Sequence, residues 1–184
     1  MESEKMLQVL IEQTRKNSNH AEQLKNYDLA TLTWKDHPDS WNILECLEHL
    51  NLYGAFYLPQ IEHKIKTATS HGEPEFTSSF LGDYFAKSML PKEKMVKMKT
   101  FKSKNPIRTQ LDKKVIDQFL LQQLQLLDLL NQSRNVSLNA VKITTTLSFL
   151  TLKLGDTFRF LINHNVRHLH QVDGVLAKME MTRR

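Results

Sequence analysis

Apolar residues recur at a helical spacing in four separate stretches of this chain. The clearest stretch covers 112–131, where apolar side chains return every three or four positions and form a broad face. The same period predicts helices over 2–26, 42–66 and 156–178. Helices with one apolar face bury that face against each other, so the pattern predicts a helical bundle.

Local sequence signals mark where two of these helices begin. Asn42 precedes the second helix and Glu45 stands three positions later, which is an asparagine version of the capping box. Gly155 ends the segment before the fourth helix, and we expect Asp156 to cap that helix. Pro59 lies within the second helix, where its missing N–H and its ring predict a bend.

Two long connections separate the helices. Residues 67–111 are too many for a structureless connection in a compact domain, so we expect a short helix around 80–90. Residues 132–155 favour β structure by composition, and we interpret them as an extended connector without paired strands. The predicted fold is all-α, a four-helix bundle in which residues 1–184 form one domain.

The composition is that of a globular protein, with 40% hydrophobic and 24% charged residues. The N-terminal residues do not resemble a secretory signal, and no apolar run approaches the roughly 20 residues of a membrane span. Cys46 is the single cysteine, which excludes an internal disulfide, and we expect it to be a buried structural thiol. We therefore expect a cytoplasmic protein without a membrane partner.

Positive charge is concentrated in residues 87–114. This segment holds ten Lys or Arg against Glu93 and Asp112, a net charge of +8, whereas the whole chain carries +5. Such a segment can attract nucleic acid, an anionic substrate or a membrane surface. Nucleic-acid binding is the less favoured function, because Phe101 is the single aromatic residue interleaved with the charges. We expect a solvated loop or a cover over a site.

Two histidines stand four positions apart on the predicted fourth helix. His164 and His168 fall on one face, one turn apart, and a pair in this arrangement can chelate a divalent ion. Two ligands do not make a site, so a third ligand must come from another helix. His49, which borders the apolar face of the second helix, is the candidate. Spacing alone leaves the alternative of ordinary surface or boundary histidines, and the HExxH motif of zinc proteases is absent.

The segments around these histidines resemble the DinB/YfiT-like superfamily of proposed metalloenzymes. Its members open a helix with tryptophan and a capping residue, reach His-Leu two turns later, and carry a late H-x-x-R-H-x-x-Q helix. The matching residues are Trp41, Asn42, Glu45, His49, Leu50, His164, Arg167, His168 and Gln171. The resemblance covers nearly the whole chain. It implies an up-down-down-up bundle in which His49, His164 and His168 bind one divalent metal ion.

Three histidine ligands leave the charge of a divalent ion intact and positions open for water or substrate, as in catalytic metal sites. Such an ion can activate water or hold a thiol as thiolate. Because the resemblance implies S-transferases that use low-molecular-weight thiols, we expect a metal-dependent S-transferase or hydrolase acting on a small molecule. Zinc or nickel is the expected ion, and Glu45 and Gln171 are candidate hydrogen-bond partners of its ligands. The alternatives are a non-catalytic metal-binding bundle and, less favoured, a nucleic-acid binder; a homodimer is left open.

Overall fold

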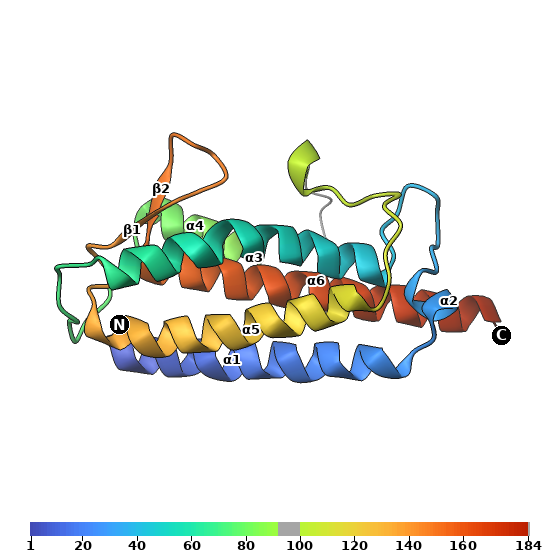
Figure 1. Ribbon diagram of the computed structural model, residues 1–184, viewed down its shortest axis with the longest axis horizontal. Helices are drawn as coiled ribbons and strands as arrows, with labels where there is room; N and C mark the ends of the chain where they lie inside the picture. The colour runs from blue at the N-terminus through green and yellow to red at the C-terminus, as the bar shows by residue number, and fades with distance from the viewer. Residues whose placement is uncertain (92–99, 184) are drawn as a thin grey trace.

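Four long helices lie side by side in the computed structural model and give the molecule an elongated shape (Figure 1). The structure describes residues 1–91 and 100–183. The long helices are α1 (Ser3–Gln23), α3 (Ile43–Lys66), α5 (Lys114–Gln132) and α6 (Leu154–Arg183). Both α1 and α3 pack against α5 and α6. The prediction of an all-α protein is therefore confirmed at the level of a predominantly helical fold.

Short elements occupy the connections between the long helices. They are α2 (Leu29–Leu32), α4 (Phe80–Ser88) and single 3-10 turns at Leu24–Asn26, Lys102–Lys104 and Ser133–Asn135. The short helix predicted around 80–90 is confirmed as α4, and the Ser79 hydroxyl oxygen caps it by accepting a hydrogen bond from the Gly82 N–H at 3.0 Å. In the basic segment, residues 92–99 lie outside the described residues.

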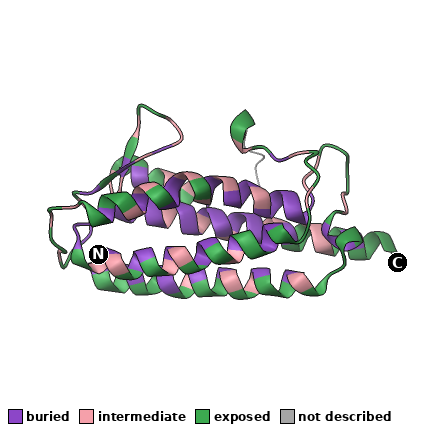
Figure 2. Cartoon of the chain, in the orientation of Figure 1, coloured by how far each residue is buried: buried purple, intermediate pink, exposed green. Residues whose placement is uncertain are grey.

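Buried apolar side chains form two clusters that follow one another along the bundle, and Figure 2 shows buried residues over its full length. The first cluster includes Tyr53 of α3 and Ile162 of α6. The second includes Leu47 of α3 and Leu169 of α6. On α6 the chain passes from one cluster to the other at His164 and His168, and on α3 it does so just after His49. The polar site is thus enclosed between two apolar regions.

The predicted capping box fixes the start of α3. The Asn42 Oδ1 accepts a hydrogen bond from the Glu45 N–H at 2.8 Å, and the Glu45 Oε2 accepts one from the Asn42 N–H at 2.9 Å. These bonds satisfy two N–H groups that a helix terminus would otherwise leave without partners. Pro59 lies inside α3, which runs without interruption from Ile43 to Lys66. Because the cap sets where α3 begins, it also sets where His49 stands two turns later.

The connection at 132–155, predicted to be an extended connector without paired strands, contains an antiparallel pair. Strand β1 (Lys142–Thr144) pairs with β2 (Thr151–Lys153), and Ile143 stands opposite Leu152. Both of these central residues are buried, whereas Lys142 and Thr151 are exposed. This alternation lets one face of the pair pack on the core. The β-favouring composition of the connection is therefore a true strand signal.

Helix α6 begins two residues earlier than predicted. Gly155 and Asp156 lie inside it, because its first residue is Leu154, and so Asp156 does not cap it. The Asp156 Oδ2 instead accepts hydrogen bonds from the Ser79 N–H at 3.0 Å and the Ser79 hydroxyl at 2.8 Å. A Cβ at Gly155 would lie 2.6 Å from the Phe76 ring, which explains the glycine at this position. The Asp156 carboxylate therefore ties α4 to α6.

Candidate metal centre

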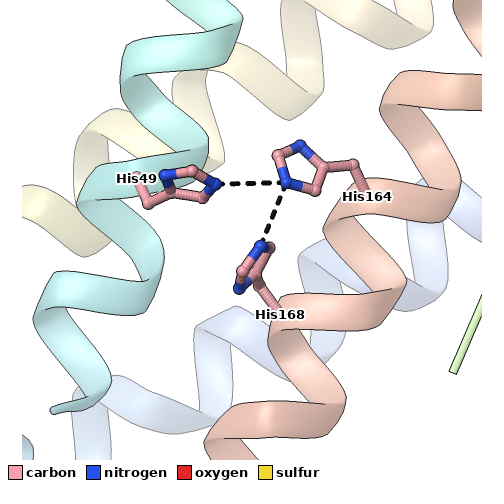
Figure 3. A group of neighbouring side chains, drawn as sticks. All are labelled: His49, His164 and His168. Carbon is pink, nitrogen blue, oxygen red and sulfur yellow. Dashed lines mark hydrogen bonds between the residues drawn. The ribbon is translucent and has the colours of Figure 1, made fainter. Parts of the chain in front are cut away.

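Three histidine side chains from two neighbouring helices meet inside the bundle (Figure 3). His49 comes from α3, and His164 and His168 come from successive turns of α6. The Nε2 atom of His164 lies 3.2 Å from Nε2 of His49 and 3.0 Å from Nε2 of His168. One ring nitrogen of each residue lies within 4.8 Å of the other two. The fold thus brings together the three residues that the sequence singles out.

The three rings are almost completely shielded from solvent. The exposed fractions are 3% for His49, 5% for His164 and 8% for His168. The Trp41 ring centroid lies 4.7 Å from that of His49 and 5.7 Å from that of His168. The Tyr53 ring centroid lies 4.9 Å from that of His49 and 4.7 Å from that of His164. The two aromatic rings therefore pack directly against the histidines.

Hydrogen bonds outside the cluster decide which nitrogen of two rings carries the proton. The His49 Nδ1–H donates to the Lys104 carbonyl oxygen at 2.6 Å, and the His168 Nδ1–H donates to the Gln171 Oε1 at 3.0 Å. Because both acceptors are amide oxygens, the proton of each ring lies on Nδ1 and the lone pair on Nε2. In both residues that lone pair points toward the Nε2 of His164. Within the described part of the chain, the buried His164 Nδ1 has no hydrogen-bond partner.

Burial keeps these rings neutral at physiological pH. Desolvation lowers the pKa of His49 to about 4 and the pKa of His168 to about 3. Desolvation also lowers the pKa of His164 well below its ordinary value, and repulsion from the charged forms of His168 and His49 adds to the effect. Neutral imidazole is the form that binds a metal ion. The electrostatics of the site therefore favour ligand chemistry over positive charge.

The arrangement of donor atoms fits a divalent cation. Two lone pairs, from His49 and His168, converge on the Nε2 of His164, and a proton on that atom can point at only one of them. A proton on the Nδ1 of His164 would instead be buried without an acceptor in the described residues. Nitrogens that each lie about 2.0–2.1 Å from one zinc ion, at angles of roughly 90–110°, are about 2.9–3.4 Å apart. The observed separations of 3.0 and 3.2 Å fall within this span.

Glu45, expected as a partner of a metal ligand, has other partners. Its side chain is 1% exposed, and its Oε1 accepts a hydrogen bond from the Arg108 N–H at 2.7 Å. Its Oε2 completes the capping box and lies 2.7 Å from the Lys35 ammonium. These contacts occupy the carboxylate, so the Lys104 carbonyl orients the His49 ring instead. The Gln171 side chain, the other expected partner, does contact His168.

The contact of Lys104 with the site has no signal in the sequence, because a main-chain acceptor is common to every residue type. The Lys104 ammonium donates to the Leu52 carbonyl at 2.7 Å and lies 5.2 Å from the centroid of the Phe56 ring. Burial lowers the pKa of this ammonium. This part of the basic segment thus covers the site. Three histidine ligands are expected to leave positions open for water or substrate, but the structure shows a closed site.

Two other features lie apart from the histidine cluster. Cys46 is fully buried, and burial raises the pKa of its thiol, as expected for a structural cysteine. A hollow of about 510 Å³ lies between α1 and α6, with Met6, Val9 and Arg159 among its lining residues. None of the three histidines lines this hollow. Neither feature adds a group to the candidate metal centre.

The sequence matches the family model of the DinB superfamily over residues 10–172. This span includes His49, His164, His168 and Gln171. No curated protein and no solved structure matches the chain. Over residues 1–91 and 100–183, none of the helices is both long enough and apolar enough to span a membrane.

Proposed function

Because the chain belongs to the DinB superfamily, we propose that it is a metal-dependent enzyme that binds one divalent ion through His49, His164 and His168. The observation that carries this proposal is the convergence of three neutral Nε2 atoms in a buried site. Zinc and nickel are the proposed ions, because imidazole suits both. We also propose one domain over 1–184 with helices in up-down-down-up order, which the helix directions in Figure 1 support.

The proposed reaction is the transfer of a low-molecular-weight thiol to an electrophilic small molecule. A divalent ion bound by three neutral histidines would supply Lewis acidity that favours the thiolate form of a thiol. In the reaction the thiolate sulfur forms a bond to the electrophilic carbon, the leaving group departs with its electron pair, and the thiol proton passes to solvent. The chain itself contributes the orientation of His49 and His168 by the Lys104 carbonyl and Gln171.

Thiol transfer is favoured over hydrolysis by what surrounds the histidines. The Trp41 and Tyr53 rings pack against the cluster and limit its contact with water, and burial raises the pKa of Tyr53 to about 12, so its hydroxyl stays protonated. Hydrolysis also calls for a general base in most metal-dependent enzymes. The Glu45 carboxylate, the acidic group expected near the metal ligands, is occupied by the capping box and by Arg108. A largely buried site in which Glu45 is not free to act as a base supports sulfur chemistry.

Turnover of a thiol separates the enzyme from a metal-binding bundle without activity. The protein is loaded with zinc or nickel and mixed with cysteine, glutathione or coenzyme A and an alkylating or arylating electrophile. Loss of free thiol is then followed over time. We expect metal-dependent thiol consumption by the wild-type protein and none above background by the His168→Ala variant, with the helical circular dichroism of both retained. Equal consumption by the variant would refute the proposed site, and no consumption with any thiol would favour the non-catalytic alternative.

A further inference from the structure

Residues 101–108, which we call the strap, pass over the N-terminal half of α3 (Figure 1, yellow-green). The Lys104 carbonyl of the strap accepts the hydrogen bond from the His49 Nδ1–H at 2.6 Å. The Lys104 ammonium donates to the Leu52 carbonyl one turn further along α3. Lys104 therefore contacts α3 twice, through its carbonyl oxygen at His49 and through its ammonium at Leu52. The carbonyl oxygen orients a candidate metal ligand.

Asn105 anchors the strap beside the site. Its Oδ1 accepts a hydrogen bond from the Trp41 indole N–H at 3.1 Å and another from the Ile107 N–H at 3.2 Å. The second bond closes an Asx turn, which stiffens the strap immediately after Lys104. The first bond joins the strap to an indole that packs on the His49 and His168 rings. One side-chain oxygen thus connects the strap to the wall of the site.

Arg108 provides the second anchor through its main chain. Its φ of 63° lies in the left-handed region, which is uncommon for a residue other than glycine. In this conformation its N–H donates to the Glu45 Oε1 at 2.7 Å. Glu45 is itself fixed by the capping box of α3 and by Lys35. The Glu45 carboxylate therefore fixes the strap at Arg108, and it affects the histidines through the strap.

We propose that Asn105 is a positioning residue of the metal centre, acting on His49 through the strap and the Lys104 carbonyl. This inference rests on the proposed function, because it concerns how a metal ligand is held. A main-chain acceptor stays in place only if the segment that carries it is anchored, and Asn105, directly after the carbonyl, anchors the strap to the Trp41 indole beside the His49 ring. Without that anchor the His49 ring loses the bond that selects its tautomer and directs its Nε2. Loss of such an outer partner typically weakens metal binding about 10–100-fold.

The test is a Co²⁺ titration, followed by visible absorption, of the full-length wild-type protein and three variants. Asn105→Ala removes the acceptor, and we expect its Co²⁺ affinity to fall about 10-fold or more. Asn105→Asp keeps an oxygen at the same place and should restore most of the affinity. Lys102→Ala removes an exposed cation from the same strap and is the matched control, with wild-type affinity expected.

Two further measurements distinguish positioning from a loss of folding. The thermal midpoint of the metal-free proteins should be nearly the same for Asn105→Ala and Asn105→Asp. Nitrogen NMR of the imidazoles should report the Nδ1–H tautomer of His49 in the wild type and a mixture of tautomers in Asn105→Ala. Wild-type affinity in Asn105→Ala would overturn this inference alone. A wild-type protein that binds no Co²⁺ would overturn the proposed function and the inference with it.

Discussion

The ring of His168 is oriented by one side chain, that of Gln171, three positions later on the same helix. The Gln171 Oε1 accepts the His168 Nδ1–H at 3.0 Å and thereby turns the Nε2 lone pair toward His164. Replacing Gln171 by alanine removes this acceptor, so we expect zinc affinity to fall about 10–100-fold. A competition titration with a zinc-binding dye measures the change. His170→Ala, at an exposed neighbouring position, is the control, and an equal loss in both variants would contradict the assigned role.

Acid should destabilise the metal-free protein through the same rings. The pKa values of His49 and His168, about 4 and about 3, lie below the ordinary value of 6.5. Below pH 6.5 the unfolded chain therefore binds protons that the folded chain does not, and the free energy of unfolding falls as the pH decreases toward these values. Above this window the histidines contribute no pH dependence.

Denaturant unfolding of metal-free protein between about pH 7 and pH 4 measures this effect. The wild type should lose more stability over the range than His49→Ala, because the variant has one fewer buried histidine to protonate. Parallel pH profiles of the two proteins would show that His49 is not the group responsible.

At the scale of the element, the capping box of α3 sets the phase of the helix that carries His49. Asn42→Ala removes the oxygen that accepts the Glu45 N–H, and we expect the free energy of unfolding to fall by about 1 kcal/mol. Asn42→Ser keeps an acceptor and should remain close to the wild type. Urea unfolding monitored by circular dichroism gives both values. A loss in Asn42→Ser as large as that in Asn42→Ala would show that the cap is not the cause.

The same helices show why some elements can be predicted from sequence and others cannot. The α3 cap is predictable because Asn42 and Glu45 are only three residues apart. Asp156 looks like another cap, but its partner Ser79 lies 77 residues away, so only the packing of α4 on α6 reveals its role. The pairing of β1 with β2 depends on Ile143 and Leu152 facing the core together, which composition alone does not decide.

At the scale of the whole molecule, the candidate site combines residues close together in the sequence with residues far apart in it. The spacing of His164 and His168 follows from helix geometry, whereas His49 is identified by the resemblance to a family motif. The hydrogen bond from the His49 ring to the Lys104 carbonyl joins residues 55 positions apart through a main-chain atom. No residue type encodes such a contact. The charge pattern of the basic segment predicts a solvated loop or a cover over a site, but it does not predict which main-chain atom contacts His49.

Binding of an ion between α3 and α6 should stabilise the whole bundle. A ligand that binds the folded chain but not the unfolded chain, at a free concentration of about 100 times its Kd, adds about 2.7 kcal/mol to the free energy of unfolding. For a chain of this length that corresponds to an increase in Tm of about 5–10 °C. Differential scanning calorimetry with and without zinc measures the shift, and EDTA should reverse it. His164→Ala should show no shift, and a full shift in this variant would contradict binding at the cluster.

The most direct test of the account is the metal content of the protein after equilibration with zinc or nickel and removal of free ion. Elemental mass spectrometry is compared for the wild type and for a variant with His49, His164 and His168 all replaced by alanine. The account predicts one ion per wild-type chain and none in the triple variant, which should keep its helical circular dichroism. A wild type that retains no ion, or a triple variant that retains as much as the wild type, would contradict it.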